Sequence, residues 1–336
     1  MAEPLKWGVL GNANIARVCV IPAIQKSANG MVHALATRSP QNAVKVAAQN
    51  NIARIYSDYN HLLDDPQIQI IYNPLPNHLH HPWTLKALKA GKHVLCEKPM
   101  ACNAREASEM AEAAESSGLM LMEALMYRFH PRSIRIKEMV ARGSVGMPCL
   151  VRSAFCFHME EKLMASGKGA RLKPEMGGGA LLDVGCYSVS VARWLLDREP
   201  SHVQGQAVYH PGGADIHFVG CLGFPDSGLA TLEASFISAL QQTFTVVGDK
   251  GAIELPHDAF VPWEKNAVFI FRKQDEEIGE QIFMPGADEY QLMVEHFANA
   301  VSGKQAPAYP PQESILNMKV LDALAKAART GKKIAI

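Results

Sequence analysis

Apolar and polar positions alternate in a regular order through the first 124 residues of the chain. Short apolar runs bounded by Gly, Pro, Asn or Asp predict buried parallel strands. Between these runs, apolar residues recur at helical spacing, as Ala107, Met110, Ala111 and Ala114 do. Strands alternating with helices predict a doubly wound, parallel α/β sheet. The expected strands are residues 6–10, 31–37, 52–56, 68–72, 94–96 and 119–122.

The pattern changes after residue 124, where longer strand-like runs follow one another with Gly, Pro and Asp turns between them. Consecutive strands joined by short turns predict a mostly antiparallel sheet. Of the 336 residues, we therefore expect 1–124 to form a doubly wound α/β domain and 125–336 an α+β domain with a large open-faced sheet. The expected strands of this second domain are 149–158, 203–209, 216–222, 228–235, 243–247 and 268–272, and helices are expected at 291–301 and 314–329.

The first predicted strand ends in a glycine turn, Gly11-Asn12-Ala13-Asn14-Ile15-Ala16. A strand, a tight turn and a helix start together present free backbone N–H groups to a pyrophosphate. Ala16 stands where the third glycine of the dinucleotide fingerprint is usual, which is an accepted variant. Ala13 replaces the second glycine and should push the phosphate slightly outward. The first domain is therefore expected to bind a dinucleotide.

The end of the second strand, Thr37-Arg38-Ser39, bears on the choice of cofactor. Folds that bind NAD place an Asp or Glu here, about 20 residues after the glycines, to hold the ribose 2′-hydroxyl. No acidic residue occurs between Glu3 and Asp58. Arg38 and Ser39 instead offer a cation and a hydroxyl to a 2′-phosphate. Arg38 could instead be a solvated loop arginine. The absence of an Asp or Glu at this strand end argues against NAD(H) in either case, so NADP(H) is favoured over NAD(H).

Two further strand ends carry candidate residues. Residues 73–81 contain two prolines and form a rigid loop suited to be a wall for a cofactor ring. The strand 94–96 leads into Glu97-Lys98-Pro99, and Pro99 biases Lys98 towards an extended conformation. The alternative is a surface Glu–Lys pair in a turn. Crossover handedness places Gly11, Asn77 and Lys98 at one edge of the sheet, where α/β folds bind ligands.

Composition excludes several classes of protein. The formal net charge is zero, which indicates neither a nucleic-acid nor an anionic-membrane partner. Seven cysteines without a C-x-x-C pair argue against a disulfide framework and a zinc site. His78, His80 and His81 lack a carboxylate or cysteine at ligand spacing, so helix-start hydrogen bonds or solvent contact are favoured over a metal. We find no signal segment and no apolar run of transmembrane length, and expect a cytoplasmic protein without a metal.

The second domain contributes a motif between two of its strands, Gly177-Gly178-Gly179 followed by residues 180–187. The glycines allow backbone to pass close to another group. Asp183 and Tyr187 are four residues apart and are expected on one face of a helix. A carboxylate and a phenol on an apolar helix need partners, either in a ligand or as a structural pair in the core. Arg171 and Lys173, upstream, either hold substrate hydroxyl or anionic groups or lie on the surface.

These motifs, together with Tyr127-Arg128-Phe129-His130-Pro131, occur in the order seen in the Gfo/Idh/MocA oxidoreductases, over nearly the whole chain. The chain most resembles the branch that contains dihydrodiol dehydrogenase, NADP-dependent D-xylose dehydrogenase, 1,5-anhydrofructose reductase and glucose–fructose oxidoreductase. The resemblance implies that Lys98 lies beside the nicotinamide and the substrate hydroxyl, often with a cis Lys98–Pro99 bond. It also implies that Asp183 and Tyr187 face the substrate, and that the open-faced sheet makes a homodimer or higher homo-oligomer. Inositol dehydrogenase relatives carry His in place of Tyr187.

The chemistry of the residues agrees with this resemblance. Hydride transfer from a carbinol carbon to nicotinamide requires a base for the hydroxyl proton. A free phenol, with a pKa of about 10, is too weakly ionised at neutral pH, and an adjacent ammonium favours the phenolate. The hypothesis is that Tyr187 is the acid/base, that Lys98 tunes it and binds the same oxygen, and that Asp183 orients the substrate. Lys98 as the direct proton carrier remains open.

We expect an NADP(H)-dependent oxidoreductase that acts on the CH–OH group of a sugar, a sugar derivative or a vicinal diol. One alternative is a nucleotide-sugar ketoreductase, which would need extra cationic groups near Arg171. Another is a non-catalytic NADP-sensing regulator, which would be expected to lose Lys98 or its partner. The expected cofactor-binding residues are Gly11, Asn12, Ala13, Asn14, Ile15, Thr37, Arg38, Ser39, Pro76, Asn77, His80, Glu97, Lys98 and Arg128. The expected substrate-binding residues are Lys98, Arg171, Asp183 and Tyr187.

Overall fold

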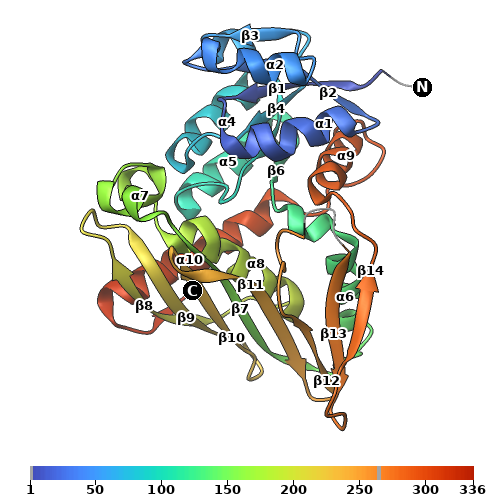
Figure 1. The fold of residues 1–336 in the computed structure, drawn as a ribbon, viewed down its shortest axis with the longest axis vertical. Helices are drawn as coiled ribbons and strands as arrows, with labels where there is room; N and C mark the ends of the chain where they lie inside the picture. Colours follow the sequence, from blue (N-terminus) through green and yellow to red (C-terminus); the bar gives the residue numbers. More distant parts are fainter. Residues whose placement is uncertain (1–2, 263–265) are drawn as a thin grey trace. The chain divides into compact units, whose positions relative to one another are not determined.

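The computed structural model describes residues 3–262 and 266–336 of the chain (Figure 1). Its contacts divide the chain into two compact units. The first unit comprises Met1–Met126 and Tyr290–Ile315, and the second comprises Tyr127–Glu289 and Leu316–Ile336. The sequence indicated one change of domain after residue 124. The structure differs in one respect, because Tyr290–Ile315 packs with the first unit.

This returning segment contains helix α9 (Glu289–Val301), close to the expected helix at 291–301. Phe297 of α9 is fully buried, and its ring centroid lies 5.9 Å from that of the equally buried Trp7. The side-chain amide of Asn29 donates to the carbonyl oxygen of Glu295 at 2.8 Å. An apolar helix near the end of the chain therefore completes the core of a sheet made by its beginning.

The sheet of the first unit has six strands, which are parallel at every paired edge. The strands are β1 (Leu5–Leu10), β2 (Gly30–Ala36), β3 (Arg54–Tyr56), β4 (Ile70–Asn73), β5 (His93–Cys96) and β6 (Leu121–Glu123). Their order is β3-β2-β1-β4-β5-β6, so the direction of winding changes between β1 and β4. The predicted doubly wound sheet is confirmed, and its ligand-binding crevice is expected at the carboxyl ends beside this change of direction.

Helices connect these strands. They are α1 (Ile21–Lys26), α2 (Val44–Gln49), α3 (Tyr59–Leu63), α4 (His80–Lys89) and α5 (Ala104–Ser117). Helix α4 begins at His80, so Pro82 falls in its first turn, where a proline is tolerated. A capping box starts α5: Asn103 Oδ1 accepts from the N–H of Glu106 at 3.0 Å, and Glu106 Oε2 accepts from the N–H of Cys102 at 3.1 Å.

The sheet of the second unit has nine strands in the order β14-β13-β12-β11-β7-β10-β9-β8-β15. All pairs are antiparallel except β7 with β10, so the predicted mostly antiparallel sheet is confirmed. The strands are β7 (Pro148–His158), β8 (His202–Tyr209), β9 (Asp215–Gly223), β10 (Leu229–Ser235), β11 (Ile237–Gly248), β12 (Gly251–Leu255), β13 (Ala267–Lys273), β14 (Glu280–Met284) and β15 (Ile334–Ala335). Sequence reasoning missed β12, β14 and β15.

The helices of the second unit are α6 (Pro131–Ala141), α7 (Glu161–Ser166), α8 (Cys186–Leu196) and α10 (Pro311–Thr330). The first five residues of α10 belong to the first unit. The two faces of the nine-stranded sheet differ in what covers them. A Cβ built at Gly220 of β9 would come 2.9 Å from Leu324 of α10, so that face is tightly covered. On the opposite face Val208, Val219 and Leu229 are exposed.

Two π-helical turns interrupt the regular helices, Ala16–Val20 after the glycine turn of β1 and Leu181–Gly185 before α8. Such turns occur frequently at functional sites. The expected single regular helix carrying Asp183 and Tyr187 therefore needs correction. Asp183 lies in the π-helical turn, whereas Tyr187 lies in the first turn of α8. Both π-helical turns stand beside residues that the sequence singled out for chemistry.

Candidate active site

The turn after β1 is shaped by Gly11. Its φ of +82° lies in the left-handed region, and a Cβ there would come 2.9 Å from Leu75 Cδ2. Its N–H donates to the carbonyl oxygen of Ala36 at 2.7 Å. The side-chain amide of Asn12 donates to the carbonyl oxygen of Asn42 at 3.0 Å, which ties this turn to the segment after β2. The backbone from Asn12 to Ile15 is thereby held at the carboxyl edge of the sheet.

The loop after β2 holds one residue inward and presents the next to solvent. Thr37 is buried; its N–H donates to the carbonyl oxygen of Tyr56 at 2.9 Å, and its Oγ1 accepts from the N–H of Ser39 at 3.3 Å. Arg38 is exposed and forms no ion pair within residues 3–262 and 266–336. Its guanidinium is therefore available to a ligand at this edge.

The segment Glu97-Lys98-Pro99 follows β5 and contains a cis Lys98–Pro99 bond. Glu97 is buried and accepts from the phenol of Tyr72 at 2.7 Å and from the N–H of Lys98 at 3.2 Å. Burial raises the pKa of Glu97, although the charge of Lys98 and the bond from Tyr72 act in the opposite direction. Lys98 is half-buried. The alternative of an exposed surface pair is therefore excluded.

The loop after β4 is fixed from within by Asn73. Its buried side-chain amide lies within 3.2 Å of both the carbonyl oxygen of His80 and Thr84 Oγ1. The N–H of Leu79 donates to the carbonyl oxygen of Pro76 at 2.7 Å. Pro76 and Asn77 are half-buried at this edge, where the sequence placed a wall for a cofactor ring.

His80, an expected cofactor residue, is almost fully buried, with Nδ1 2.8 Å from the carbonyl oxygen of Pro99 and Nε2 2.6 Å from that of Leu75. Burial lowers the pKa of His80 to about 4. Both ring nitrogens face backbone oxygens, so His80 links the loop after β4 to the loop that carries Lys98.

The neighbouring histidines do not converge on a common point. His81 Nε2 lies 2.7 Å from Glu109 Oε2 on α5, whereas the ring of His80 lies between two backbone carbonyls. Within the described residues, no group of three or more His, Cys, Asp or Glu side chains is arranged to hold a metal ion.

In the second unit, three of the predicted substrate residues form one cluster. Arg171 Nε donates to Asp183 Oδ2 at 2.6 Å, and the guanidinium lies 5.6 Å from the centroid of the Phe157 ring. The charge of Asp183 is the main reason that the pKa of Arg171 is raised, and Tyr187 adds to this effect. Arg171 is partly exposed, Asp183 less so, and Tyr187 is buried. A polyol that reached this cluster would meet both hydrogen-bond donors and acceptors.

Aromatic residues surround Tyr187. Its ring centroid lies 5.2 Å from that of Phe260, 5.3 Å from Phe155 and 6.1 Å from Tyr127. Sequence reasoning did not assign Phe155 or Phe260 to the site. Phe155 could have been found, because it lies on a strand beside the cluster, whereas Phe260 lies in an irregular segment with no periodic signal. The packing fixes the ring plane of Tyr187.

Arg128, an expected cofactor residue, is held by helix α8 of its own unit. Its Nη2 donates to Ser190 Oγ at 3.0 Å, and its Cζ lies 5.4 Å from the centroid of the Trp194 ring. The hydroxyls of Ser190 and Tyr127 lie 2.8 Å apart. Arg128 therefore lies against α8, the helix that carries Tyr187.

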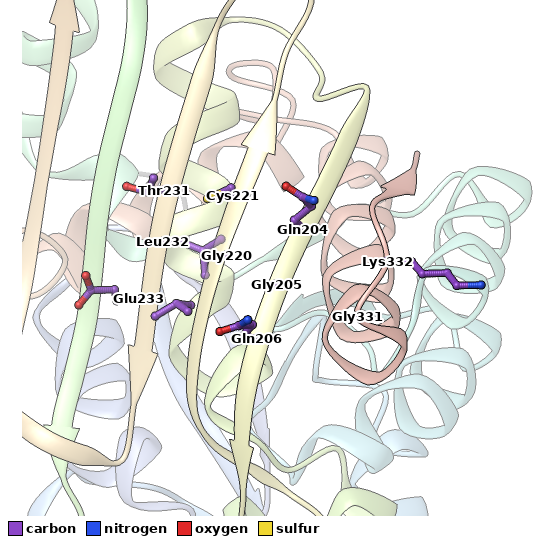
Figure 2. A pocket seen from close by; sticks show the side chains of 11 residues that line it. Gln204, Gly205, Gln206, Gly220, Cys221, Thr231, Leu232, Glu233, Gly331 and Lys332 are labelled. Atoms are coloured by element: carbon purple, nitrogen blue, oxygen red, sulfur yellow. The ribbon is translucent and has the colours of Figure 1, made fainter.

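A cavity of 430 Å³ lies elsewhere, on strands β8, β9 and β10 (Figure 2). Two rows of side chains cross these strands there, Gln204–Cys221–Thr231 and Gln206–Val219–Glu233. None of the predicted site residues lines it.

Among the described helices, none combines the length and the apolar character needed to cross a bilayer.

A doubly wound parallel sheet with a glycine turn at its change of direction defines a dinucleotide-binding fold. The half-buried Lys98 stands at a neighbouring strand end, at the edge of the sheet where such folds bind their ligands. Comparison with family models agrees: residues 5–125 match the oxidoreductase family with an NAD-binding Rossmann fold, and residues 134–254 match the GFO/IDH/MocA C-terminal domain. The chain belongs to the Gfo/Idh/MocA oxidoreductase family, as its motifs predicted.

Named relatives cover nearly the whole chain. D-xylose 1-dehydrogenase (NADP(+)) 2 from Haloferax volcanii is 34% identical over 330 residues, which cover 98% of this chain and 99% of that protein. Trans-1,2-dihydrobenzene-1,2-diol dehydrogenase from Xenopus tropicalis is 30% identical over 76% of this chain and 77% of its own. The solved structure of KijD10, a 3-ketoreductase from Actinomadura kijaniata in complex with NADP and TDP-benzene, is 26% identical with a TM-score of 0.89, over 97% of this chain and 98% of that one.

Proposed function

We propose that this protein is an NADP(H)-dependent dehydrogenase or reductase of the CH–OH group of a sugar, a sugar derivative or a vicinal diol. The observation that carries the proposal is Lys98 at the carboxyl end of β5, on a loop fixed by the buried Glu97 and His80. The relatives support it, because their names specify NADP(+), a pentose sugar and a vicinal diol.

The residues of the first unit fit a dinucleotide. The turn that begins at Gly11 lies at the carboxyl edge of the sheet, before the helical turn Ala16–Val20, where such folds bind a pyrophosphate on free backbone N–H groups. The exposed Arg38 and the hydroxyl of Ser39 suit a 2′-phosphate, with Thr37 fixing the loop that carries them. When bound, the nicotinamide ring supplies the carbon that accepts or gives the hydride.

The preference for NADP(H) can be tested at Arg38. Because a hydrogen bond to a charged group contributes about 1.5–3 kcal/mol, Arg38→Ala should weaken NADPH binding roughly 10- to 100-fold and leave NADH binding nearly unchanged. The measurement is NADPH and NADH fluorescence on binding. The matched control is Arg105→Ala, which removes an exposed arginine of α5 and should change neither affinity. An equal loss for both cofactors in Arg38→Ala would contradict the assignment.

We further propose roles for the residues that act on the substrate. Tyr187 takes the hydroxyl proton as the hydride leaves, and Lys98 binds the same oxygen and favours the phenolate. Asp183 orients the substrate together with its ion-pair partner Arg171. The alternative, in which Lys98 carries the proton itself, needs only that the lysine reach the hydroxyl. General acid–base catalysis of this kind contributes about 10²- to 10⁴-fold to the rate.

Two substitutions separate these possibilities. Lys98→Met should lower kcat at least about 100-fold under either hypothesis. Tyr187→Phe should lower kcat about 10²- to 10⁴-fold if the phenol carries the proton, whereas a near-normal rate assigns the proton to Lys98. Turnover is measured against pH with a panel of aldoses, ketoses and diols. Tyr209→Phe, on an exposed tyrosine of β8, is the control. Full activity in both Lys98→Met and Tyr187→Phe would refute the proposed site.

A nucleotide-sugar ketoreductase is the second candidate. The observation that favours it is the similarity to the 3-ketoreductase KijD10 over nearly the whole of both chains. It ranks second because Arg171, near which a diphosphate would need cations, is itself paired with Asp183. A non-catalytic NADP sensor ranks third, because Lys98, Asp183 and Tyr187 are all retained.

We propose that the protein is a homodimer formed through the uncovered face of the nine-stranded sheet. Val208, Val219 and Leu229 are 55%, 41% and 54% exposed there, and the cavity in Figure 2 lies among the same strands. Large apolar side chains gathered on one face are typical of an interface. Light scattering should give twice the 36.7 kDa of one chain. Val219→Glu should yield monomers and Val18→Glu, on an exposed residue of the first unit, should not; a monomeric wild type would contradict the proposal.

We infer a cytoplasmic location. All seven cysteines are free thiols, as expected in a reducing compartment. Cell fractionation that recovers the protein only with secreted or envelope proteins would contradict this inference.

A further inference from the structure

Asp215, at the first residue of β9, lies against the start of the helical segment that carries Asp183 and Tyr187. Its Oδ2 accepts a hydrogen bond from the N–H of Leu181 at 2.7 Å. The first N–H groups of a helix have no partner within the helix. Asp215 therefore caps this helix from a strand more than 30 residues away in the sequence.

The second and third glycines of the triple-glycine motif make room for this arrangement. Gly179 has a φ of +122°, and a Cβ there would overlap Asp215 Oδ1. At Gly178 a Cβ would collide with the carbonyl oxygens of Ala170 and Arg171. The N–H of Gly179 donates to that same carbonyl of Arg171 at 2.9 Å. The motif therefore joins Asp215, the helix start and the backbone of Arg171 in one rigid contact.

Groups around Asp215 act on the pKa of its carboxylate in opposite directions. Burial raises its pKa, whereas the N–H groups of Leu181 and Ala180 and the charge of Arg329 act to lower it. Arg329 and Asp215 also line one small cavity, of 30 Å³, with Leu181 and Phe218. An anion at a helix N-terminus is favourable because the helix dipole is positive there. The carboxylate thus accepts from the start of the helical segment, and the cation that favours its charge lies on α10.

We propose that Asp215 is a positioning residue for the reaction: its carboxylate fixes the beginning of the π-helical turn and thereby the direction in which Asp183 and Tyr187 point. Asp183 sits two residues after Leu181, within the turn whose first N–H group donates to Asp215. The N–H of Asp183 donates to the carbonyl oxygen of Gly179 at 3.0 Å, so movement of the helix start moves Asp183. This inference depends on the proposed function in so far as Asp183 and Tyr187 meet the substrate.

The test uses the full-length protein with Asp215→Ala and Asp215→Asn. Asp215→Ala should lower kcat for the best substrate on the order of 10- to 100-fold, because small displacements of reacting groups have effects of this size. It should also raise the substrate KM, and the pH at which kcat is half-maximal should shift. NADPH affinity, which depends on the first unit, should change less than about twofold. Asp215→Asn keeps one acceptor oxygen and should recover most of the lost kcat.

A second readout does not depend on activity. Hydrogen exchange followed by mass spectrometry should show faster exchange over residues 180–187 in Asp215→Ala and little change elsewhere. Gly179→Ala, which displaces the carboxylate, should give the same local pattern. In a double-mutant cycle, its effect on kcat should shrink when Asp215 is already Ala. Asp275→Ala, on an exposed aspartate between β13 and β14, is the matched control and should be silent.

Three outcomes decide the matter. Normal kcat, KM and pH profile in folded Asp215→Ala, with reduced thermal stability alone, would show a structural cap and overturn the proposal. Unchanged exchange over residues 180–187 would also overturn it. If wild-type protein binds no NADPH, the proposed function fails, but the exchange experiment still tests whether Asp215 anchors the helix.

Discussion

A carboxylate taken out of water must be hydrogen-bonded, and this constraint shapes each segment that carries a candidate catalytic residue. Glu97 is buried at the end of β5 and is held by Tyr72 and by the N–H of Lys98. The loop that presents Lys98 therefore has little freedom to vary. Asp183 and Asp215 meet the same requirement in the second unit, through Arg171 and through the start of the helix before α8.

Neutral groups complete this support. His80 places its ring between the carbonyl oxygens of Leu75 and Pro99, and so couples the loops after β4 and β5. The ring of Tyr187 is fixed by Phe155 and Phe260, while Arg171 lies over Phe157. A reaction that transfers a hydride and a proton needs reacting groups held in place before the substrate arrives. The arrangement of each unit meets that need within the unit itself.

The sequence was informative wherever the signal is local. Parallel strands are buried on both faces and read as apolar runs, so β1, β2 and β4 were found. Strand β14 was missed because most of its side chains are exposed and its sequence is partly polar. The packing of α9 on β1 was missed because Phe297 and Trp7 are almost the whole chain apart.

The candidate site likewise combines residues with a local sequence signal and contacts between residues far apart in the sequence. Strand ends and turn motifs identified Gly11, Arg38, Lys98, Asp183 and Tyr187 from the sequence. No spacing rule revealed that Arg171 pairs with Asp183, that both nitrogens of His80 face backbone oxygens, or that Asp215 caps the helix before α8. Such contacts depend on chain reversals and on glycine conformations, which apolar periodicity does not encode.

Every role proposed for the site serves hydride transfer from a substrate carbinol carbon to NADP⁺. This transfer is measured by incubating the protein with NADP⁺ and aldoses or vicinal diols that carry deuterium at the carbinol carbon, followed by mass spectrometry of the reduced cofactor. We expect NADPH that carries one deuterium, formed in proportion to oxidised product. Reduced cofactor without deuterium, or no reduced cofactor with any substrate of the panel, would contradict it.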